Sequence, residues 1–213
     1  MLHVLRAFCT IMLLNMSGMI TRSFCSNTHS VHNIMRYSII FDKKMPSIYI
    51  DKQLHIDPIT QKKMYSVEHI FPRCLLQKKD HYDMHNTIRT LNELNVNRSN
   101  YKYADIMNIE NDKNWVKLDF DNYVNHKLKL FVPNKASRGF IARAVLYMSK
   151  EYDYNPHKII DKDVLLHWFF NYPPDQAEKH HNEVVKKLQH KNNVFISAYN
   201  KKTRSILKYL HDL

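Results

Sequence analysis

The 213-residue sequence predicts an α+β fold, in which short strands come first and helices follow. In the first half of the chain, apolar residues alternate with polar ones over short stretches that end at turn residues, which is typical of strands. In the second half, apolar residues recur every three or four positions, which is typical of one buried helix face. A chain of this length can bury one substantial core. We therefore expect one domain with short strands and a mainly helical C-terminal half.

Residues 1–30 are predicted to be an N-terminal leader or a disordered extension, and residues 31–213 a single domain. Residues 1–41 contain arginines but no Asp or Glu, and the apolar run at 7–14 precedes Ser17-Gly18, as in a secretory signal. The same composition fits a mitochondrial presequence or an unprocessed intracellular extension. The apolar run is too short for a membrane-spanning helix. We expect secretion, with the other two locations as alternatives, and no membrane association after the leader is removed.

The stretch 64–71 alternates apolar and polar residues and is predicted to be a strand. Looser alternation at 37–41 and 48–56 predicts short extended segments before it. On the strand, the neighbours Glu68 and His69 should point to opposite faces unless a bulge redirects one of them.

A basic loop at 73–82 separates this strand from a second one, predicted at 83–91. Residues 93–103 are then predicted to form a short helix, with Asn92 as its cap. Alternation resumes over 115–132 and predicts further strands. The sequence thus predicts a strand–loop–strand–helix unit that is followed by more strands.

Four helices are predicted from apolar residues at helical spacing, over 138–152, 161–170, 175–190 and 197–210. The aromatic residues Trp168, Phe169 and Phe170 are expected to lie in the core. Arg143 is expected to have a structural role. The pair His180-His181 resembles a metal-binding pair only superficially, and we interpret it as part of a solvated helix face.

Composition narrows the possible functions. The formal net charge of +12 favours a polyanionic partner such as nucleic acid, although a Lys-rich composition bias would give the same excess. The only glycines are Gly18 and Gly139, so glycine-rich phosphate loops are excluded. Two of the three cysteines fall within the predicted leader, and the sequence contains neither a CxxC nor an HExxH motif. We therefore expect neither a disulfide framework nor a structural zinc site of the usual kinds.

Polar residues are concentrated between positions 66 and 103, in a pattern that suits hydrolysis of phosphodiester bonds. Such residues are solvated or form a site, because burial of unpaired polar groups costs several kcal/mol. The neutral side chain of His69 is a suitable general base near pH 7. One carboxylate and one amide oxygen, from Glu68 and Asn95, suffice to hold a Mg²⁺ ion that keeps several waters. Mn²⁺ or Ca²⁺ could take its place.

Several motifs in this order resemble the endonuclease I family, the ββα-metal-finger group of periplasmic and secreted bacterial nucleases. The resemblance covers roughly residues 64–196. The motifs that carry it are Glu68-His69-Ile70-Phe71-Pro72, Asp83-Met84-His85-Asn86, Asn95 with Arg98-Ser99-Asn100-Tyr101, Arg138-Gly139-Phe140-Ile141-Ala142-Arg143 with Leu146-Tyr147-Met148-Ser149, and a later set from Trp168 to Ile196.

The resemblance implies a ββα-metal core at about residues 64–103 and a role for each site residue. Glu68 and Asn95 would bind the metal, and His69 would be the general base, its ring oriented by a backbone carbonyl. Three further polar residues are expected to support the site: His85, Asn86 and Asn100.

The resemblance also implies a phosphate-binding arginine in the loop between the two strands. The loop from Pro72 to Asp83 is short, and no arginine aligns with that position. We expect the phosphate contacts to come from other cations instead, namely Arg73 or Lys78, with Lys79 as a further candidate. Arg138 is expected either to contact phosphate as well or to pair with an acid at the start of its helix.

The sequence therefore predicts a monomeric, Mg²⁺-dependent and sequence-non-specific endonuclease that cuts DNA, with RNA as a second substrate and no small-molecule cofactor. The missing loop arginine motivates one alternative, a catalytically degenerate nucleic-acid-binding protein of the same fold. A structural protein with a fortuitous motif is a third, and it would place Asn95 far from Glu68. A glycosylation sequon at Asn97-Arg98-Ser99, inside the predicted site, counts against secretion.

Overall fold

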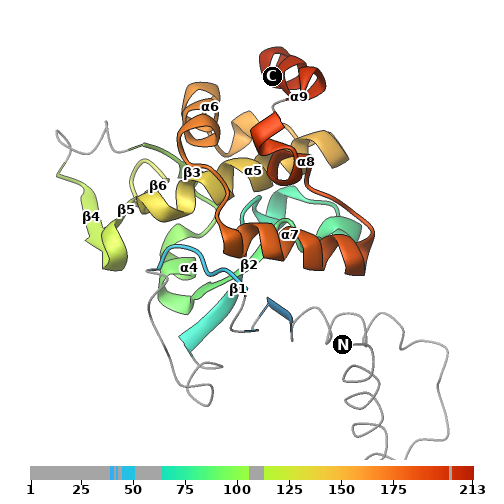
Figure 1. Cartoon of the computed structure of the whole chain (residues 1–213). Helices are drawn as coiled ribbons and strands as arrows, with labels where there is room; N and C mark the ends of the chain where they lie inside the picture. The colour runs from blue at the N-terminus through green and yellow to red at the C-terminus, as the bar shows by residue number, and fades with distance from the viewer. Residues whose placement is uncertain (1–38, 41, 43–44, 51–63, 106–112, 202) are drawn as a thin grey trace, which may run out of the picture. The chain divides into compact units, whose positions relative to one another are not determined.

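The computed structural model describes residues 39–40, 42, 45–50, 64–105, 113–201 and 203–213, which belong to one compact unit, Ser38–Leu213 (Figure 1). The predicted leader at 1–30 lies outside the described residues, as does most of the extended segment predicted over 48–56. Residues 39–40 are helical, so the strand predicted over 37–41 is wrong at these two positions. Among the described helices, none has the length and apolar character that crossing a membrane requires.

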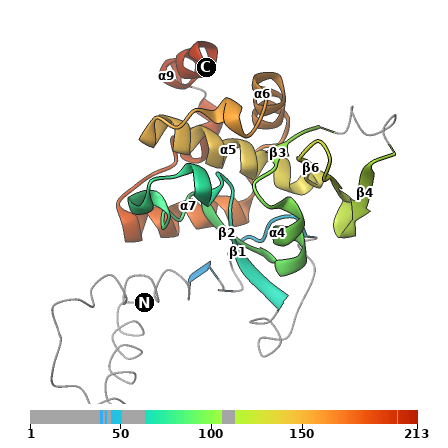
Figure 2. The same ribbon diagram turned by 180° about the vertical axis from the view of Figure 1, so that it is seen from behind.

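The fold is α+β, as predicted, and its first unit is a hairpin followed by a helix. The strands β1 (Tyr65–His69) and β2 (Thr87–Leu91) pair antiparallel, with Glu68 opposite Ile88. Helix α4 (Asn92–Arg98) follows β2 directly and packs against both strands (Figure 1 and Figure 2). The basic loop between the strands contains two short 3-10 turns, Arg73–Leu75 and Lys78–Asp80.

Helix α4 is shorter than the helix predicted over 93–103. It ends at Arg98 because Ser99 takes a positive φ of 53°, which an α-helix cannot continue through. Asn92 lies inside the helix, and Leu91 occupies the capping position without a side-chain hydrogen bond. The chain then turns into β3 (Lys102–Tyr103), the first strand of a second sheet.

The second sheet has four strands in the order β3-β6-β5-β4. Its remaining members are β4 (Trp115–Leu118), β5 (Asn122–Asn125) and β6 (Leu130–Val132), so the strands predicted over 115–132 are confirmed. The pair β3 and β6 is parallel, and the other pairs are antiparallel.

The C-terminal half is helical, and its long central helix is α5 (Lys135–Tyr152). Asn134 caps α5 by accepting a hydrogen bond from the backbone N–H of Ser137. Helix α5 packs against α6 (Lys162–Asn171) and α8 (Val194–Ser197), and α7 (Gln176–Gln189) packs against α8. The helix predicted over 197–210 is interrupted, because the last helix, α9, spans only Arg204–Asp212.

Burial confirms most of the predicted core. Trp168 and Phe169 are fully buried, whereas Phe170 is 40% exposed, so its assignment to the core was wrong. Arg143 has the predicted structural role, because its buried guanidinium pairs with Glu178 and joins α5 to α7.

The interpretation of His180-His181 as a solvated face is wrong for the second residue. His181 is only 2% exposed, and its Nε2 donates to the backbone carbonyl of Met84 at 2.9 Å. The side chain of His180 is exposed. Burial lowers the pKa of His181 from 6.5 to about 4, so the imidazole is neutral in the folded protein at neutral pH.

Lowering the pH from 7 to 5 is expected to reduce the free energy of unfolding by about 2 kcal/mol through His181 alone. In this window the unfolded chain binds a proton at His181 and the folded chain does not, so stability is present above pH 6.5 and is lost toward pH 4. Urea unfolding at a series of pH values measures the slope.

The variant His181→Gln should flatten this slope, because glutamine does not titrate. The matched control is His180→Gln, one residue earlier and exposed, which should leave the slope unchanged. Equal slopes in the wild type and in His181→Gln would contradict the assignment.

Candidate active site

The end of β1 places the two central site residues in different surroundings. Glu68 is 2% exposed, whereas His69 is partly exposed. Beside β2, the segment 47–50 brings a third residue to the site, because Ile48 donates its backbone N–H to the carbonyl of Arg89 at 3.0 Å. The site is therefore built from the hairpin, α4 and this preceding segment.

The carboxylate of Glu68 is held through one of its two oxygens. Oε1 accepts a hydrogen bond from the Tyr49 hydroxyl at 2.9 Å and lies 3.3 Å from Nε of Arg98. That Nε makes no well-directed hydrogen bond, so the contact with Arg98 is an ion pair. Burial raises the pKa of Glu68, and Arg98 and Tyr49 oppose this shift.

Arg98 ties the end of α4 to the end of β1. Its Nη1 donates to the carbonyls of His69 at 3.3 Å and Ser99 at 3.0 Å, and its Nη2 donates to the carbonyl of Ile70 at 2.7 Å. The guanidinium carbon also lies 4.6 Å from the centroid of the Tyr103 ring. Arg98 therefore fixes both the carboxylate of Glu68 and the backbone next to it.

The ring of His69 is oriented by a backbone carbonyl, as the family resemblance implies. Its Nε2 lies 2.9 Å from the carbonyl oxygen of His81. A carbonyl only accepts hydrogen bonds, so Nε2 carries the proton and Nδ1 keeps a lone pair. Burial lowers the pKa of His69, so the neutral form prevails at pH 7.

Asn95 reaches β1 from α4, so the structure brings it to the strand that carries Glu68. Its Nδ2 donates to Oγ of Ser66 at 2.9 Å and to the carbonyl of Val67 at 3.2 Å. Among the described residues, none donates to its Oδ1. The distant placement of Asn95 that a fortuitous motif would give is therefore not observed.

The oxygen atoms at this site suit a hard cation. Among the described residues, no cluster of three or more His, Cys, Asp or Glu side chains could hold a metal, so a cation would depend on one or two protein oxygens and on water. Within the part of the chain that the structure describes, the fully buried side-chain atoms without a hydrogen-bond partner are His85 Nδ1 and Arg98 Nε. The Glu68 carboxylate is buried, and Oε1 carries its contacts with Tyr49 and Arg98, so Oε2 is the Glu68 oxygen that would bind a cation, beside Oδ1 of Asn95.

The predicted phosphate-binding cations differ in their placement. Arg73 is exposed, and its Nε donates to Nδ1 of His81 at 3.1 Å, so it lies beside the loop that orients His69. Lys78 is exposed on the second turn of the same loop.

Arg138 does not have the environment of a phosphate ligand. It is 3% exposed, its Nη1 pairs with Asp105 at 2.9 Å, and its guanidinium lies against the Trp168 ring. Of the two roles expected for Arg138, the structure shows the pairing with an acid, here Asp105.

Of the three residues expected to support the site, Asn86 does so directly. Its side chain exchanges hydrogen bonds with the backbone N–H and carbonyl of Phe71, at 2.7 and 3.1 Å, and so fixes the chain after β1. His85 is buried against Tyr147 in the helical half. Asn100 is exposed and contacts Sγ of Cys74 at 3.7 Å.

Sequence reasoning missed the roles of Tyr49 and Arg98. Arg98 could have been found, because it lies three residues after Asn95 and therefore on the same side of the helix. No sequence pattern indicates the role of Tyr49, because Tyr49 is 19 positions before Glu68 and their contact depends on tertiary packing.

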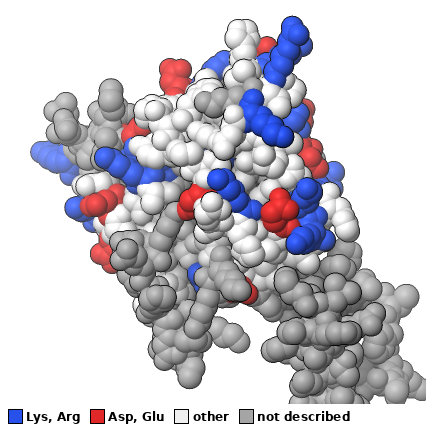
Figure 3. Space-filling model, in the orientation of Figure 1, with Lys and Arg blue, Asp and Glu red and all other residues white. Residues whose placement is uncertain are grey.

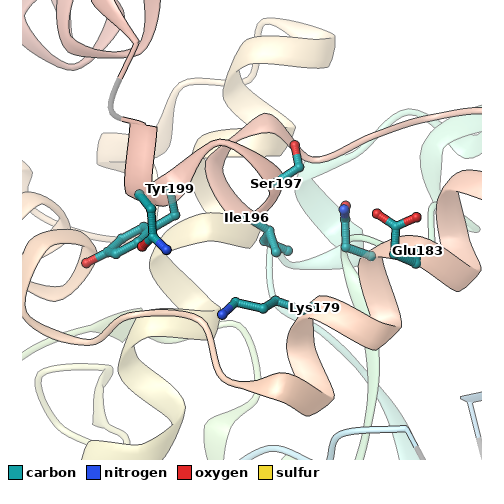
Figure 4. A pocket seen from close by; sticks show the side chains of 7 residues that line it. Lys179, Glu183, Ile196, Ser197 and Tyr199 are labelled. Carbon is teal, nitrogen blue, oxygen red and sulfur yellow. The ribbon is translucent and has the colours of Figure 1, made fainter.

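Other surface features lie away from these residues. A pocket of about 260 Å³ is lined by residues of α7, α8 and the turn after them, and includes none of the predicted site residues (Figure 4). On the face drawn in Figure 3, Lys and Arg side chains are interspersed with Asp and Glu. That face therefore shows no patch of uniformly positive charge.

The fold and the site together define an α+β protein with an acid–histidine pair at the end of a hairpin strand and an asparagine on the helix that follows. The family model described as Endonuclease I matches residues 19–199, and the chain belongs to the endonuclease I family.

Two relatives from Aeromonas hydrophila show the extent of the similarity. An extracellular deoxyribonuclease is 34% identical over 116 residues, which are 54% of this chain and 48% of the relative. A periplasmic deoxyribonuclease is 32% identical over 116 residues, which are 54% of this chain and 46% of the relative. The matched region thus spans about half the length of these relatives.

Proposed function

We propose that the chain is a metal-dependent endonuclease that hydrolyses phosphodiester bonds in DNA, with RNA as a second substrate. The observation that carries the proposal is the hydrogen bond from His69 Nε2 to the His81 carbonyl, which leaves Nδ1 as a base. That base lies next in sequence to Glu68, on the strand that Asn95 also contacts. Family membership and the deoxyribonuclease names of the relatives support DNA as the substrate.

In this mechanism the protein residues have separate tasks. Nδ1 of His69 accepts a proton from the attacking water, whose oxygen forms the new bond to phosphorus as the bond between phosphorus and the leaving oxygen breaks. Oε2 of Glu68 and Oδ1 of Asn95 would hold one Mg²⁺, which supplies positive charge to the leaving oxygen. Arg73, whose Nε donates to the ring of His81, binds the phosphate.

Secretion is part of the proposal. The relatives are named as extracellular and periplasmic proteins, which supports it, and the comparisons lend no support to a mitochondrial location. We further propose that the protein acts as a monomer.

Removing divalent metal is expected to abolish plasmid cleavage. Supercoiled plasmid is incubated with the purified protein and Mg²⁺, with and without chelator, and nicked and linear products are measured on gels. The expected result is nicking that chelator stops and added Mg²⁺ restores. Undiminished cutting in excess chelator would contradict the metal mechanism.

Binding of the plasmid is the control that separates the enzyme from the degenerate alternative. Contacts to phosphates release counterions, so DNA binding should weaken steeply with salt in either case. Salt-sensitive binding without cleavage in Mg²⁺, Mn²⁺ or Ca²⁺ would favour the binding protein, for which the missing loop arginine is the motivating observation.

A further inference from the structure

We propose that Tyr49 is a positioning residue that determines which cation the site selects. By donating to Oε1 of Glu68, the Tyr49 hydroxyl leaves Oε2 as the oxygen that faces the cation, so that Glu68 binds through one oxygen. Such a site favours small octahedral Mg²⁺ over the larger Ca²⁺. The inference rests on the proposed function, because it concerns the same metal site.

The first support is the direction of the hydrogen bonds around Tyr49. Its hydroxyl has one proton, which goes to Glu68 Oε1 at 2.9 Å. The Tyr103 hydroxyl lies 2.7 Å from that of Tyr49, and its single proton is shared between Tyr49 and the carbonyl oxygen of Ile70 at 3.3 Å. Tyr49 therefore lies in a buried chain of hydroxyl groups that ends on the Glu68 carboxylate.

The second support is the backbone of Tyr49. Its φ is 65°, a left-handed conformation that is unfavourable for a bulky residue. The conformation is fixed from both sides, because Tyr49 N–H donates to Oγ of Ser137 at 2.8 Å and Asn122 Nδ2 donates to the Tyr49 carbonyl at 2.7 Å. Strained conformations held by surrounding structure are concentrated at functional sites.

The third support is the chemistry of the two carboxylate oxygens. Oε1 carries both the Tyr49 hydrogen bond at 2.9 Å and the Arg98 ion pair at 3.3 Å. Binding through both oxygens would require a cation to compete at Oε1 with the Tyr49 hydroxyl and with the positive charge of Arg98. Ca²⁺ accepts carboxylates through one or both oxygens with six to eight ligands, whereas Mg²⁺ demands octahedral geometry and keeps several waters. Occupation of Oε1 therefore disfavours Ca²⁺ more than Mg²⁺.

The test measures cation binding to the full chain and its Tyr49→Phe variant. Phenylalanine keeps the ring and removes only the hydroxyl. Mg²⁺ and Ca²⁺ are titrated separately by calorimetry, in the absence of DNA. We expect the ratio of Mg²⁺ to Ca²⁺ affinity to fall by about tenfold in the variant, as for loss of one hydrogen bond to a charged group. With Mg²⁺, kcat for DNA cleavage should fall while KM stays unchanged, because Tyr49 is fully buried and cannot touch DNA.

The matched control is Tyr147→Phe. Tyr147 is also buried and its hydroxyl also donates to a carboxylate, that of Asp83 at 3.0 Å, but it lies in the helical half. This variant should keep the wild-type affinity ratio, and circular dichroism shows whether each variant is folded.

The outcomes separate the inference from the proposed function. If the wild type binds neither Mg²⁺ nor Ca²⁺, the proposed metal site fails. If the wild type prefers Mg²⁺ and Tyr49→Phe keeps the same preference, the role of Tyr49 is overturned. Should the variant not fold, infrared difference spectra of the wild type with ¹³C-labelled Glu decide the matter, since one-oxygen and two-oxygen binding give different carboxylate stretches. A two-oxygen signature with Mg²⁺ would overturn the inference.

Discussion

Replacing His69 by alanine is expected to lower the rate of DNA cleavage by about 10²–10⁴-fold, the usual contribution of a general base. The imidazole is the group at the end of β1 that has a free lone pair and a ring fixed by the His81 carbonyl. Alanine leaves the attacking water without a proton acceptor. The loss of transition-state stabilisation corresponds to about 3–5 kcal/mol. Single-turnover cleavage of a labelled duplex in saturating Mg²⁺ measures it.

His180→Ala provides the matched control, because His180 is exposed on α7 and belongs to no part of the proposed site. It should cleave at the wild-type rate. Since the proposed metal ligands remain in His69→Ala, that variant should still bind DNA and cation. Full cleavage activity in His69→Ala would remove the histidine from the mechanism.

Arg98→Met is expected to lower the free energy of unfolding by about 3–5 kcal/mol, as is typical when one partner of a buried ion pair is removed. The side chains of Arg98 and Glu68 are 1% and 3% exposed, so water cannot replace the lost guanidinium. The substitution also leaves the carbonyls of His69 and Ile70 without their donor. Guanidinium chloride unfolding, followed by circular dichroism, gives the difference in stability.

The double variant Arg98→Met with Glu68→Gln should recover part of this loss, because it removes the uncompensated charge. A surface ion pair supplies the comparison. The Lys102–Asp161 pair has side chains that are 33% and 68% exposed, and Lys102→Met should change stability by about 0–1 kcal/mol. A similarly small effect of Arg98→Met would show that the buried pair does not stabilise the fold.

Local patterns in the sequence predicted the elements that build the site. The alternation over 64–71 predicted β1, and the helical spacing over 138–152 predicted α5, because both patterns reflect one buried face of one element. The end of α4 could not be predicted in this way. It depends on the positive φ of Ser99, a conformation that the surrounding residues impose.

Long-range contacts explain the predictions that failed. Arg138 and Arg73 are both arginines next to site motifs, and only packing against Trp168 and Asp105 distinguishes the buried one from the exposed one. The same holds for His180 and His181, of which only the second contacts Met84. The position of Tyr49 at the site depends on hydrogen bonds of its backbone with Ser137 and Asn122, which are 88 and 73 positions away along the chain.

The contact that orients His69 determines which sequence changes the loop between Pro72 and Asp83 can accept. The acceptor is the main-chain carbonyl of His81, and every amino acid supplies a main-chain carbonyl. Exchanging the side chain at position 81 keeps this main-chain acceptor but removes the ring contacts of His81 with Arg73 Nε and the Leu76 carbonyl, whereas inserting or deleting a residue in the loop would move the acceptor along the chain. The length of the segment between Pro72 and Asp83 is therefore constrained, because it sets which main-chain carbonyl faces His69. In this protein, the register of the loop keeps the histidine in position, and the contacts of the His81 ring with Arg73 and Leu76 hold the loop itself.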